Sequence, residues 1–511
     1  MQSQNNFISS REMRAIEINA EYFGIQLLQL MEIAGRNVSQ EITTRFPKDK
    51  NIIIICGLGG NGGDGFVTAR HLLTEGFKVS ILIAGRARDI THQATLQNYT
   101  ILQSLQTKIP ITEITDSTTI PDINADIIID ALLGTGAKGK LRAPIQQIVE
   151  AINTAKGFKL AIDIPTGIDS DSGEVQGTAV QADLTVTFHK PKKGLEKANR
   201  YTGKVIVSSI GLPSELERFA GPGDVQMVLK PRNPAAHKGD FGRLLVIGGN
   251  EIYFGAPVLV SLAAMRTGVD LIYLATPQKN ATPIASLSPD LITIKLQGDN
   301  LNPDNIATLK PFIKIVDIVA LGPGLGLDVK TQEFVKVCID EVEAAGKTLL
   351  LDADGLKAFA SFKRALKVPL VLTPHVAEYV LLAGTPLPEA QEEQISAIQK
   401  TAKSLNATIL LKNRVDLICD SNRVKLNFTG NAGMTVGGTG DVLCGIVAGL
   451  MALHADPFEA AVAGAFVNGA AGDFVALERG YHMTATDIIE WIAQVLETPM
   501  DHLKVKKSHV T

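Results

Sequence analysis

The sequence predicts an α/β protein built from two successive domains. Short, continuous runs of Ile, Val and Leu alternate with longer helical stretches, which is typical of parallel strands covered by helices on both faces of a sheet. The chain has 511 residues, which is too many for one hydrophobic core. Proline and glycine interrupt the pattern at residues 221–240. We therefore expect one domain over residues 1–225 and a second over residues 230–503.

The first domain opens with a helical pattern over residues 10–44. A fully apolar strand at 52–56 follows, and then a glycine-rich loop and a helix at 66–75. Later apolar runs predict four further strands, at residues 79–84, 127–132, 160–164 and 184–188.

The second domain starts with a strand at residues 243–247. Its later apolar runs predict strands at residues 271–275, 318–321, 348–351, 370–372 and 408–411. Its most informative segment is Gly437-Gly438-Thr439-Gly440-Asp441, because the apolar run 442–453 follows at once. That run predicts a buried helix whose N-terminus begins at the glycine loop.

Asp441 is the first candidate catalytic residue. Glycines let a backbone approach an anion closely, and a helix N-terminus attracts it. A carboxylate repels an anion, so Asp441 points to a second task, which is to accept a proton from a hydroxyl that attacks a phosphoryl group. The alternative is an ordinary helix N-cap after a glycine turn.

The composition excludes several classes of function. Hydrophobic residues make up 45% of the chain, charged residues 20%, and the net charge is −4 at pH 7. This balance offers no electrostatic case for nucleic acid or an anionic membrane. The four cysteines show no CxxC spacing, and residues 1–7 carry no basic, apolar leader. We therefore expect a cytoplasmic protein with reduced thiols.

The glycine-rich segment 57–65 of the first domain fits G-x-G-x-x-G after a strand, a pattern that binds phosphate. The second strand ends without the acidic residue that a dehydrogenase uses for ribose. Residues 134–140 nearly match a Walker A loop, but Leu141 replaces the Ser or Thr that holds magnesium, which argues against an NTPase.

Two further strand ends converge on the glycine-rich segment if the sheet is parallel. Asn61, Asp130 and Thr166 then offer hard oxygen donors for a monovalent or divalent cation. Asp163 and Lys138 are candidates for a proton-transfer pair. A structural ion pair at the strand ends is an equally good interpretation of those two residues.

These motifs resemble the NAD(P)H-hydrate epimerase domain, from residue 11 to residue 194. The resemblance implies a Rossmann-like three-layer fold and a potassium ion held by Asn61, Asp130 and Thr166. It also implies substrate contacts at Gly60, Asn61, Gly62, Gly63, Asp64, Gly134, Thr135, Gly136, Ala137, Lys138, Gly139, Lys140 and Asp163. The chain departs from the family pattern at Gly60, where an asparagine is usual, and at Thr166, where serine is usual.

The second domain resembles the ADP-dependent NAD(P)H-hydrate dehydratase, which has a ribokinase-like α/β fold. The motifs are residues 237–243, 253–257, 322–326, 351–356, 373–375 and 437–441. The resemblance implies substrate contacts at Ala256, Gly324, Gly326, His375 and Asp441. It implies nucleotide contacts at Lys412, Asn413, Arg414, Val415, Asp416 and Gly440. Two points stay open: a capping or core histidine is the alternative interpretation of His375, and Asn413 replaces the usual glycine.

Together the resemblances imply a bifunctional metabolite-repair enzyme. It would interconvert the R and S forms of hydrated NADH and NADPH (NADHX and NADPHX), and dehydrate the S form with ADP and Mg²⁺. We also expect a homo-oligomer. One alternative is a vitamin-precursor kinase of the ribokinase-like group. The other is a first domain that serves only as a binding module, with Gly60 marking lost catalysis.

Overall fold

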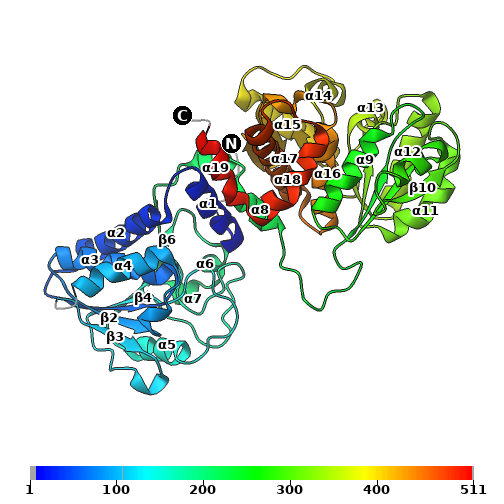
Figure 1. Cartoon of the computed structure of the whole chain (residues 1–511). Coiled ribbons are helices and arrows are strands. Elements are labelled where there is room, and N and C mark those ends of the chain that lie inside the picture. The colour runs from blue at the N-terminus through cyan, green and yellow to red at the C-terminus, as the bar shows by residue number, and fades with distance from the viewer. Residues whose placement is uncertain (1–6, 106–107, 509–511) are drawn as a thin grey trace. The chain divides into compact units, whose positions relative to one another are not determined.

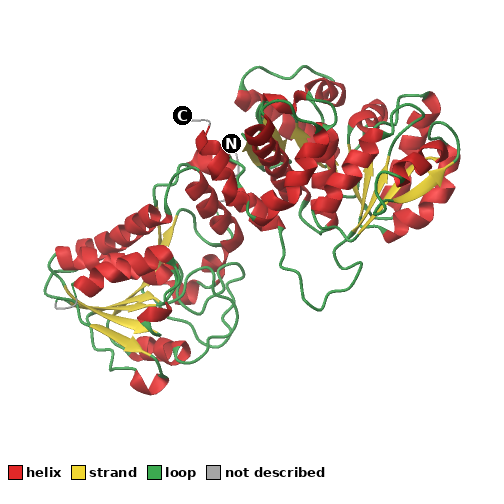
Figure 2. Ribbon diagram, in the orientation of Figure 1, coloured by secondary structure: helices red, strands yellow, loops and turns green. Residues whose placement is uncertain are grey.

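A computed structural model describes residues 7–105 and 108–508 of the chain. Residues 1–6, on which part of the leader prediction rests, lie outside the described residues. The chain forms two compact units, Met1–Leu216 (unit 1) and Glu217–Thr511 (unit 2), shown in Figures 1 and 2.

Unit 1 is a three-layer α/β unit around a fully parallel sheet. In spatial order its strands are β3 (Ile111–Ile114), β2 (Lys78–Ala84), β1 (Asn51–Cys56), β4 (Ile127–Ala131), β5 (Phe158–Ile162), β6 (Leu184–Phe188) and β7 (Lys204–Ser208). Its helices are α1 (Ser10–Tyr22), α2 (Leu27–Arg45), α3 (Gly60–Thr74), α4 (Gln93–Ser104), α5 (Ile145–Thr154), α6 (Lys193–Lys197) and α7 (Asn199–Thr202). Helices α2, α3 and α4 cover one face and α5 the other (Figure 1). The order reverses between β1 and β4, which is where ligands bind in such sheets.

Unit 2 is built on a mixed sheet in which β15 runs antiparallel to both of its neighbours, β14 and β16. In spatial order its strands are β10 (Ile292–Leu296), β9 (Leu271–Pro277), β8 (Arg243–Ile247), β11 (Ile318–Leu321), β12 (Thr348–Leu351), β13 (Leu370–Leu372), β14 (Ala407–Leu411), β15 (Asp416–Cys419) and β16 (Val424–Asn427). Its helices are α8 (Pro222–Val228), α9 (Gly255–Arg266), α10 (Gln278–Ala285), α11 (Ile306–Ile315), α12 (Val329–Ala344), α13 (Ala353–Phe362), α14 (Val376–Ala383), α15 (Gln391–Leu405), α16 (Thr439–Ala452), α17 (Pro457–Arg479), α18 (Ala485–Glu497) and α19 (His502–Ser508). The α/β prediction is confirmed for both units.

Helix α17 is long and apolar enough to cross a membrane by length and composition. However, 89% of its most apolar window is buried inside the protein, where it packs against strands β13 to β16. Helix α17 therefore serves as a core helix of unit 2.

Three local expectations differ from the structure. The helical pattern 10–44 forms two helices, because Gly24 adopts φ +101° between them. The interval 221–240 contains helix α8, which packs against α17, and Asp224 pairs with Lys425 at 2.8 Å. The chain therefore divides at residues 216–217, before the interval that the sequence indicates.

The third difference is that residues 60–65 are the first turns of helix α3 and not a loop. The glycines there permit close packing. A Cβ atom on Gly62 would lie 1.9 Å from the carbonyl oxygen of Gly57, and one on Gly65 would lie 2.7 Å from Cys56 Sγ. The unusual glycine content therefore lets α3 press against β1, and phosphate binding is not needed to explain it.

We expect Gly62→Ala to destabilise unit 1 by about 1–3 kcal/mol. Alanine favours a helix by about 1 kcal/mol, but the added methyl group would overlap rigid backbone, and overlap dominates. Gly60→Ala is the matched control, since nothing lies within 4 Å of its added carbon in the same helix. Thermal unfolding of the full chain measures both, and equal melting temperatures would contradict this account of the glycines.

Candidate functional site

Unit 1 has a cavity of about 430 Å³ at the carboxyl ends of β1 and β4. Among the predicted substrate residues, those that line it are Gly60, Asn61, Asp64, Gly134, Thr135, Gly136, Ala137 and Asp163. The other predicted contacts do not line it. Gly62 and Gly63 are buried within α3, and Lys138, Gly139 and Lys140 lie beyond the cavity wall.

Two of the three predicted cation ligands contact each other, and the third, Asn61, lines the cavity. Thr166 donates from its backbone nitrogen to Asp130 Oδ2 and from its hydroxyl to Asp130 Oδ1, both at 2.8 Å. Burial raises the pKa of Asp130 to about 6, although these bonds oppose the shift. Both polar side-chain atoms of Asn61 are buried without a hydrogen-bond partner among the described residues. A buried carboxylate and a buried amide oxygen without a partner are the kinds of donor that an oxygen-ligated cation uses.

Asp163 has a different partner from the one proposed. Its Oδ1 accepts from Lys192 Nζ at 2.6 Å and from the Thr187 hydroxyl at 3.1 Å. Lys138 instead pairs with Asp171 at 3.5 Å, and its side chain is 64% exposed. The Asp163–Lys138 pair is therefore wrong, because Lys138 lies on a solvent-exposed loop whereas Lys192, 1% exposed, lies at the cavity wall.

Asp163 is held in a conformation that is rare for a residue with a side chain. Its φ is +65°, and its backbone nitrogen donates to the Val186 carbonyl oxygen on the neighbouring strand at 2.7 Å. Such strain is retained where the surrounding structure requires it, and it is concentrated at functional sites. The strained carboxylate at the end of β5 is thus a candidate for chemistry.

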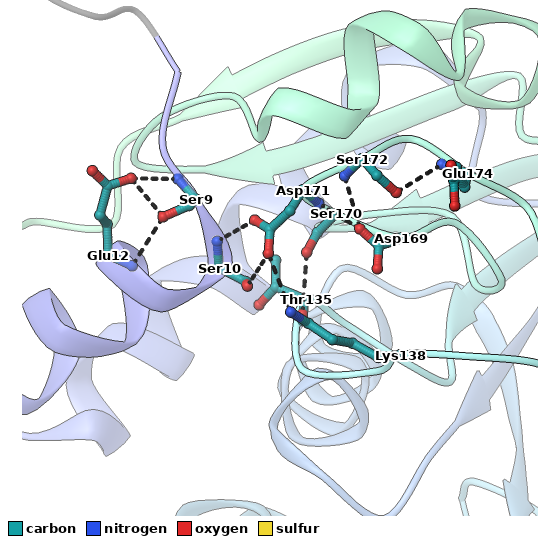
Figure 3. A network of polar contacts seen from close by, with 10 residues as sticks. All are labelled: Ser9, Ser10, Glu12, Thr135, Lys138, Asp169, Ser170, Asp171, Ser172 and Glu174. Atoms are coloured by element: carbon teal, nitrogen blue, oxygen red, sulfur yellow. Dashed lines mark hydrogen bonds and ion pairs between the residues drawn. The ribbon is translucent and has the colours of Figure 1, made fainter. Parts of the chain in front are cut away.

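Helix α1 contributes Met13 and Glu17 to the cavity wall. Asp171 fixes its first turn, because the backbone nitrogen and the hydroxyl of Ser10 both donate to the Asp171 carboxylate at 2.7 Å (Figure 3). The neighbouring Ser170 hydroxyl donates to the carbonyl oxygen of Thr135 at 3.2 Å. One loop therefore holds both α1 and the segment that carries Gly134 to Ala137.

In unit 2, Asp441 lies in the first turn of α16 and interacts with Asp352 and Lys412, which directly follow strands β12 and β14. The N-cap is Gly438, with φ +95°, and no side chain caps the helix, so Asp441 is not the capping residue. Burial raises the pKa of Asp441 to about 7, with a further contribution from Asp352 that Lys412 opposes. The helix N-terminus and this carboxylate lie together, as a phosphoryl-transfer site requires.

Lys412 and Asp352 complete the charged centre. Lys412 Nζ lies 3.0 Å from Asp352 Oδ1, and Asp352 is 2% exposed. Burial acts to lower the pKa of Lys412. The negative charges of Asp352 and Glu378 have the larger effect, so the pKa is raised. A Cβ atom on Gly440 would lie 3.5 Å from Lys412 Nζ. The ammonium group therefore stands beside the N-terminal turn of α16.

The predicted substrate residues Ala256, Gly324 and Gly326 also come together. A Cβ atom on Gly324 would lie 3.5 Å from Ala256 Cβ, and one on Gly326 would lie 2.8 Å from Asn250 Nδ2. Gly324 and Gly326 have φ of +67° and +77°, which other residues rarely adopt. The backbone nitrogen of Gly326 donates to Asp354 Oδ2 at 2.9 Å, which ties this loop to helix α13.

His375 is both a cap and an exposed side chain. Its Nδ1 accepts from the Glu378 backbone nitrogen at 3.4 Å, and its backbone nitrogen donates to Glu378 Oε2 at 3.0 Å. The ring is still 53% exposed. His375 pairs across the sheet with Lys412, so it stands next to the charged centre.

Residues 412–416 form the tight connection between the antiparallel strands β14 and β15. The backbone nitrogen of Asn413 donates to Asp416 Oδ1 at 3.1 Å. Burial raises the pKa of Asp416 to about 6, although its hydrogen bonds oppose the shift. Asn413 is not among the described residues with positive φ, so it needs no glycine-like conformation. The backbone at Asn413 is therefore one that residues other than glycine readily adopt.

Sequence reasoning assigned no role to Glu17, Lys192 or Asp352. Asp352 lies in the 351–356 motif and directly follows a predicted strand, which is a signal that could have been used. Glu17 stands on an amphipathic helix and carries no local signal. Among the described residues, no group of three or more His, Cys, Asp or Glu forms a metal cluster.

Comparison with known proteins was made for both units. A family described as NAD(P)H-hydrate dehydratase matches residues 244–494, and one described as YjeF-related protein N-terminus matches residues 27–194. A bifunctional NAD(P)H-hydrate repair enzyme of Pyrobaculum aerophilum is 42% identical over 496 residues, covering 96% of this chain and 98% of that protein. The repair enzyme of Hyperthermus butylicus is 40% identical over 501 residues, covering 97% and 93%.

Solved structures resemble unit 2. The ADP/ATP-dependent NAD(P)H-hydrate dehydratase of Bacillus subtilis, co-crystallised with ATP and Mg²⁺, is 26% identical and covers 55% of this chain and 98% of that one, with a TM-score of 0.47. A ribokinase-like superfamily protein of Enterococcus faecalis is 27% identical, covers 55% and 95%, and has a TM-score of 0.48. From the near full-length relatives and the two matched domains, the chain belongs to the family of bifunctional NAD(P)H-hydrate repair enzymes, with an epimerase and a dehydratase domain.

Proposed function

We propose that unit 1 interconverts the R and S epimers of NADHX and NADPHX, and that unit 2 dehydrates the S epimer at the expense of ADP. The observation that carries the second half is the position of Asp441. Its carboxylate lies in the first turn of α16 and interacts with the charge of Lys412. A base and a positive charge at a helix N-terminus support a role in phosphoryl transfer.

The dehydration proceeds in two stages. The Asp441 carboxylate takes the proton of the ring hydroxyl while the hydroxyl oxygen attacks the β-phosphorus of ADP. This attack releases AMP. The backbone N–H groups of the α16 N-terminus and the Lys412 ammonium stabilise the charge on the transferring group. The ring phosphate then leaves, the neighbouring ring carbon loses a proton, and the dihydropyridine is restored.

Mg²⁺ belongs to the proposal as the ion that arrives with the nucleotide. Magnesium is usually held by one or two carboxylates together with substrate phosphates, so it needs no cluster of protein ligands. Asp352 and Asp441, whose charges act on each other, are the carboxylates that would hold it. When bound, the ion would neutralise phosphate charge.

The proposal is tested by absorbance at 340 nm, with a mixture of both NADHX epimers, ADP and Mg²⁺. Complete recovery of NADH supports both activities, since one epimer alone cannot account for it. Recovery that stops at the S fraction would mean that unit 1 does not epimerise, as the binding-module alternative states. No recovery with ADP or ATP would overturn the dehydratase proposal and favour a vitamin-precursor kinase.

We expect dehydration to be favoured by rising pH. Asp441 must be ionised to accept a proton, and its pKa is raised to about 7, so below that value the inactive acid predominates. The kcat/KM for the S epimer should therefore increase about tenfold per pH unit below the pKa and level off above it. Initial rates with saturating ADP and Mg²⁺ measure this, with circular dichroism at each pH as the control. A flat profile would contradict the assignment of Asp441 as base.

Potassium is proposed for unit 1, held by Asn61, Asp130 and Thr166. We expect K⁺ to raise the melting temperature of unit 1 more than Na⁺ does. At a K⁺ concentration of roughly 100 Kd, binding should add about 2.7 kcal/mol to the free energy of unfolding. Asn61→Ala should abolish the difference, because it removes an amide oxygen that is buried without a partner. Equal melting temperatures in both salts would reject the site.

The remaining parts of the proposal concern assembly and location. We propose action in the cytoplasm, where the four buried free thiols, Cys56, Cys338, Cys419 and Cys444, would stay reduced.

We also propose a homo-oligomer, with the exposed apolar side chains of unit 1 as candidates for the interface, namely Leu96, Ile101 and Val207. Light scattering after gel filtration measures the mass.

A further inference from the structure

The cavity of unit 1 contains further carboxyl groups besides the Asp163–Lys192 pair. Its wall also carries Glu17 from α1 and Asp64 from α3. Among the described residues, neither of these two carboxylates takes part in a hydrogen bond or an ion pair. Leaving a carboxylate without a partner beside apolar side chains costs free energy. A purely structural role therefore does not explain Glu17 or Asp64.

Other acids of unit 1 show what a structural carboxylate looks like. Asp171 accepts two bonds from Ser10 and faces Lys138, while Asp169 accepts from the backbone nitrogens of Asp171 and Ser172. Those bonds lower the pKa of Asp169 despite burial. Glu17 has none of these partners, so its carboxyl group remains available to a ligand.

The surroundings of Glu17 favour its protonated form. Burial raises the pKa of Glu17 to about 7, Asp163 raises it further, and Lys192 and Arg14 act in the opposite direction. Burial also raises the pKa of Asp64 well above its usual value, and the charges of Asp163 and Glu17 add to this. His92 lines the same cavity. Near neutral pH the cavity can thus offer a carboxylic acid and a carboxylate at once.

Glu17 is also held in a fixed position. Helix α1 starts at Ser10, and the Asp171 carboxylate binds both polar groups of that residue (Figure 3). Ser9 and Glu12 add a capping box to the same turn. A catalytic group on an anchored helix keeps the precision that proton transfer requires.

We propose that Glu17 is the second proton-transfer residue of the epimerase cavity and that it works as the acid while Asp163 works as the base. The inference rests on the proposed epimerase function and deepens it. Lys192 and Thr187 both donate to Oδ1 of Asp163. The second carboxylate oxygen, Oδ2, therefore remains as an acceptor. The two groups come from different elements, α1 and the end of β5, which lets them serve different faces of a bound ring.

The reaction balances with water as the only co-reactant. Glu17 donates its proton to the ring hydroxyl, the carbon–oxygen bond breaks and water leaves, while the ring nitrogen supplies its electron pair to form a carbon–nitrogen double bond. A water molecule then adds to the opposite face of that carbon and gives its proton to Asp163, and the electron pair returns to nitrogen. Exchange with solvent through the open cavity returns the proton to Glu17.

The test uses the full chain and the pure R epimer of NADHX without nucleotide, so that dehydration cannot proceed. Chromatography follows the appearance of the S epimer above the spontaneous rate. We expect Glu17→Gln to lower kcat about 10²- to 10⁴-fold, with a much smaller change in KM. In the native chain kcat/KM should fall above a pKa of about 7, and this alkaline limb should be absent from the residual activity of the variant.

Glu21→Gln is the matched control, because Glu21 lies one turn further along α1 and does not line the cavity. It should leave the rate unchanged, and both variants should dehydrate the pure S epimer with ADP and Mg²⁺ at the native rate. A Glu17→Gln chain that epimerises normally would overturn this inference and leave the proposed function intact. A native chain that does not epimerise would instead overturn the proposed function itself.

Discussion

Asp441→Asn is expected to lower kcat for dehydration of the S epimer about 10²- to 10⁴-fold. Asparagine keeps the size of the side chain but cannot accept a proton from the attacking hydroxyl. Burial and Asp352 disfavour the charged form of Asp441 and raise its pKa to about 7. Removing this charge should therefore not destabilise unit 2. Absorbance at 340 nm with pure S epimer, ADP and Mg²⁺ measures the loss.

Two controls separate chemistry from electrostatics and folding. Glu459→Gln removes an acid from the first turn of α17, the neighbouring apolar helix, and so reproduces the change in charge at a helix N-terminus. It should dehydrate at the native rate. Epimerisation by the Asp441→Asn chain should also be native, because unit 1 is unaltered. If both substitutions lowered dehydration equally, Asp441 would not be the base.

The second large effect is expected at Asp163. Asp163→Asn should lower epimerisation about 10²- to 10⁴-fold and leave dehydration of the pure S epimer unchanged. The substituted amide cannot take a proton from water, and it also leaves Lys192, 1% exposed, without its 2.6 Å carboxylate partner. Breaking a buried pair on one side costs about 3–5 kcal/mol, so stability must be measured together with activity.

The double variant Asp163→Asn with Lys192→Met distinguishes these two effects. It removes both charges, so the unpaired buried ammonium disappears and the melting temperature should recover relative to the single variant. Epimerase activity should not recover, because the base is still missing. A double variant that regains both stability and epimerisation would mean that the pair is structural, the interpretation that the sequence left open for Asp163.

The sequence by itself determined the α/β class, the position of most strands and the existence of both domains. Parallel strands buried on two faces are continuously apolar, and glycine marks close backbone approach, so both features are visible locally. The apolar run after Asp441 likewise predicted α16 correctly, because a continuous apolar segment identifies a buried helix without knowledge of what packs against it. The strands β3, β7 and β10 escaped detection because they contain exposed residues, and β15 and β16 escaped it because they have only four residues each.

Only the tertiary structure decided which charged groups meet. Asp163 and Lys192 are 29 positions apart, yet the fold joins them at 2.6 Å and sends Lys138 to Asp171 instead. Glu17 reaches the same cavity from a helix whose own sequence carries no sign of it. Close packing accounts for Gly62, Gly63 and Gly65 in the first turns of α3. Hydrophobic patterns are local, whereas ion pairs, burial and steric fit depend on distant segments, and these set the chemistry of the site.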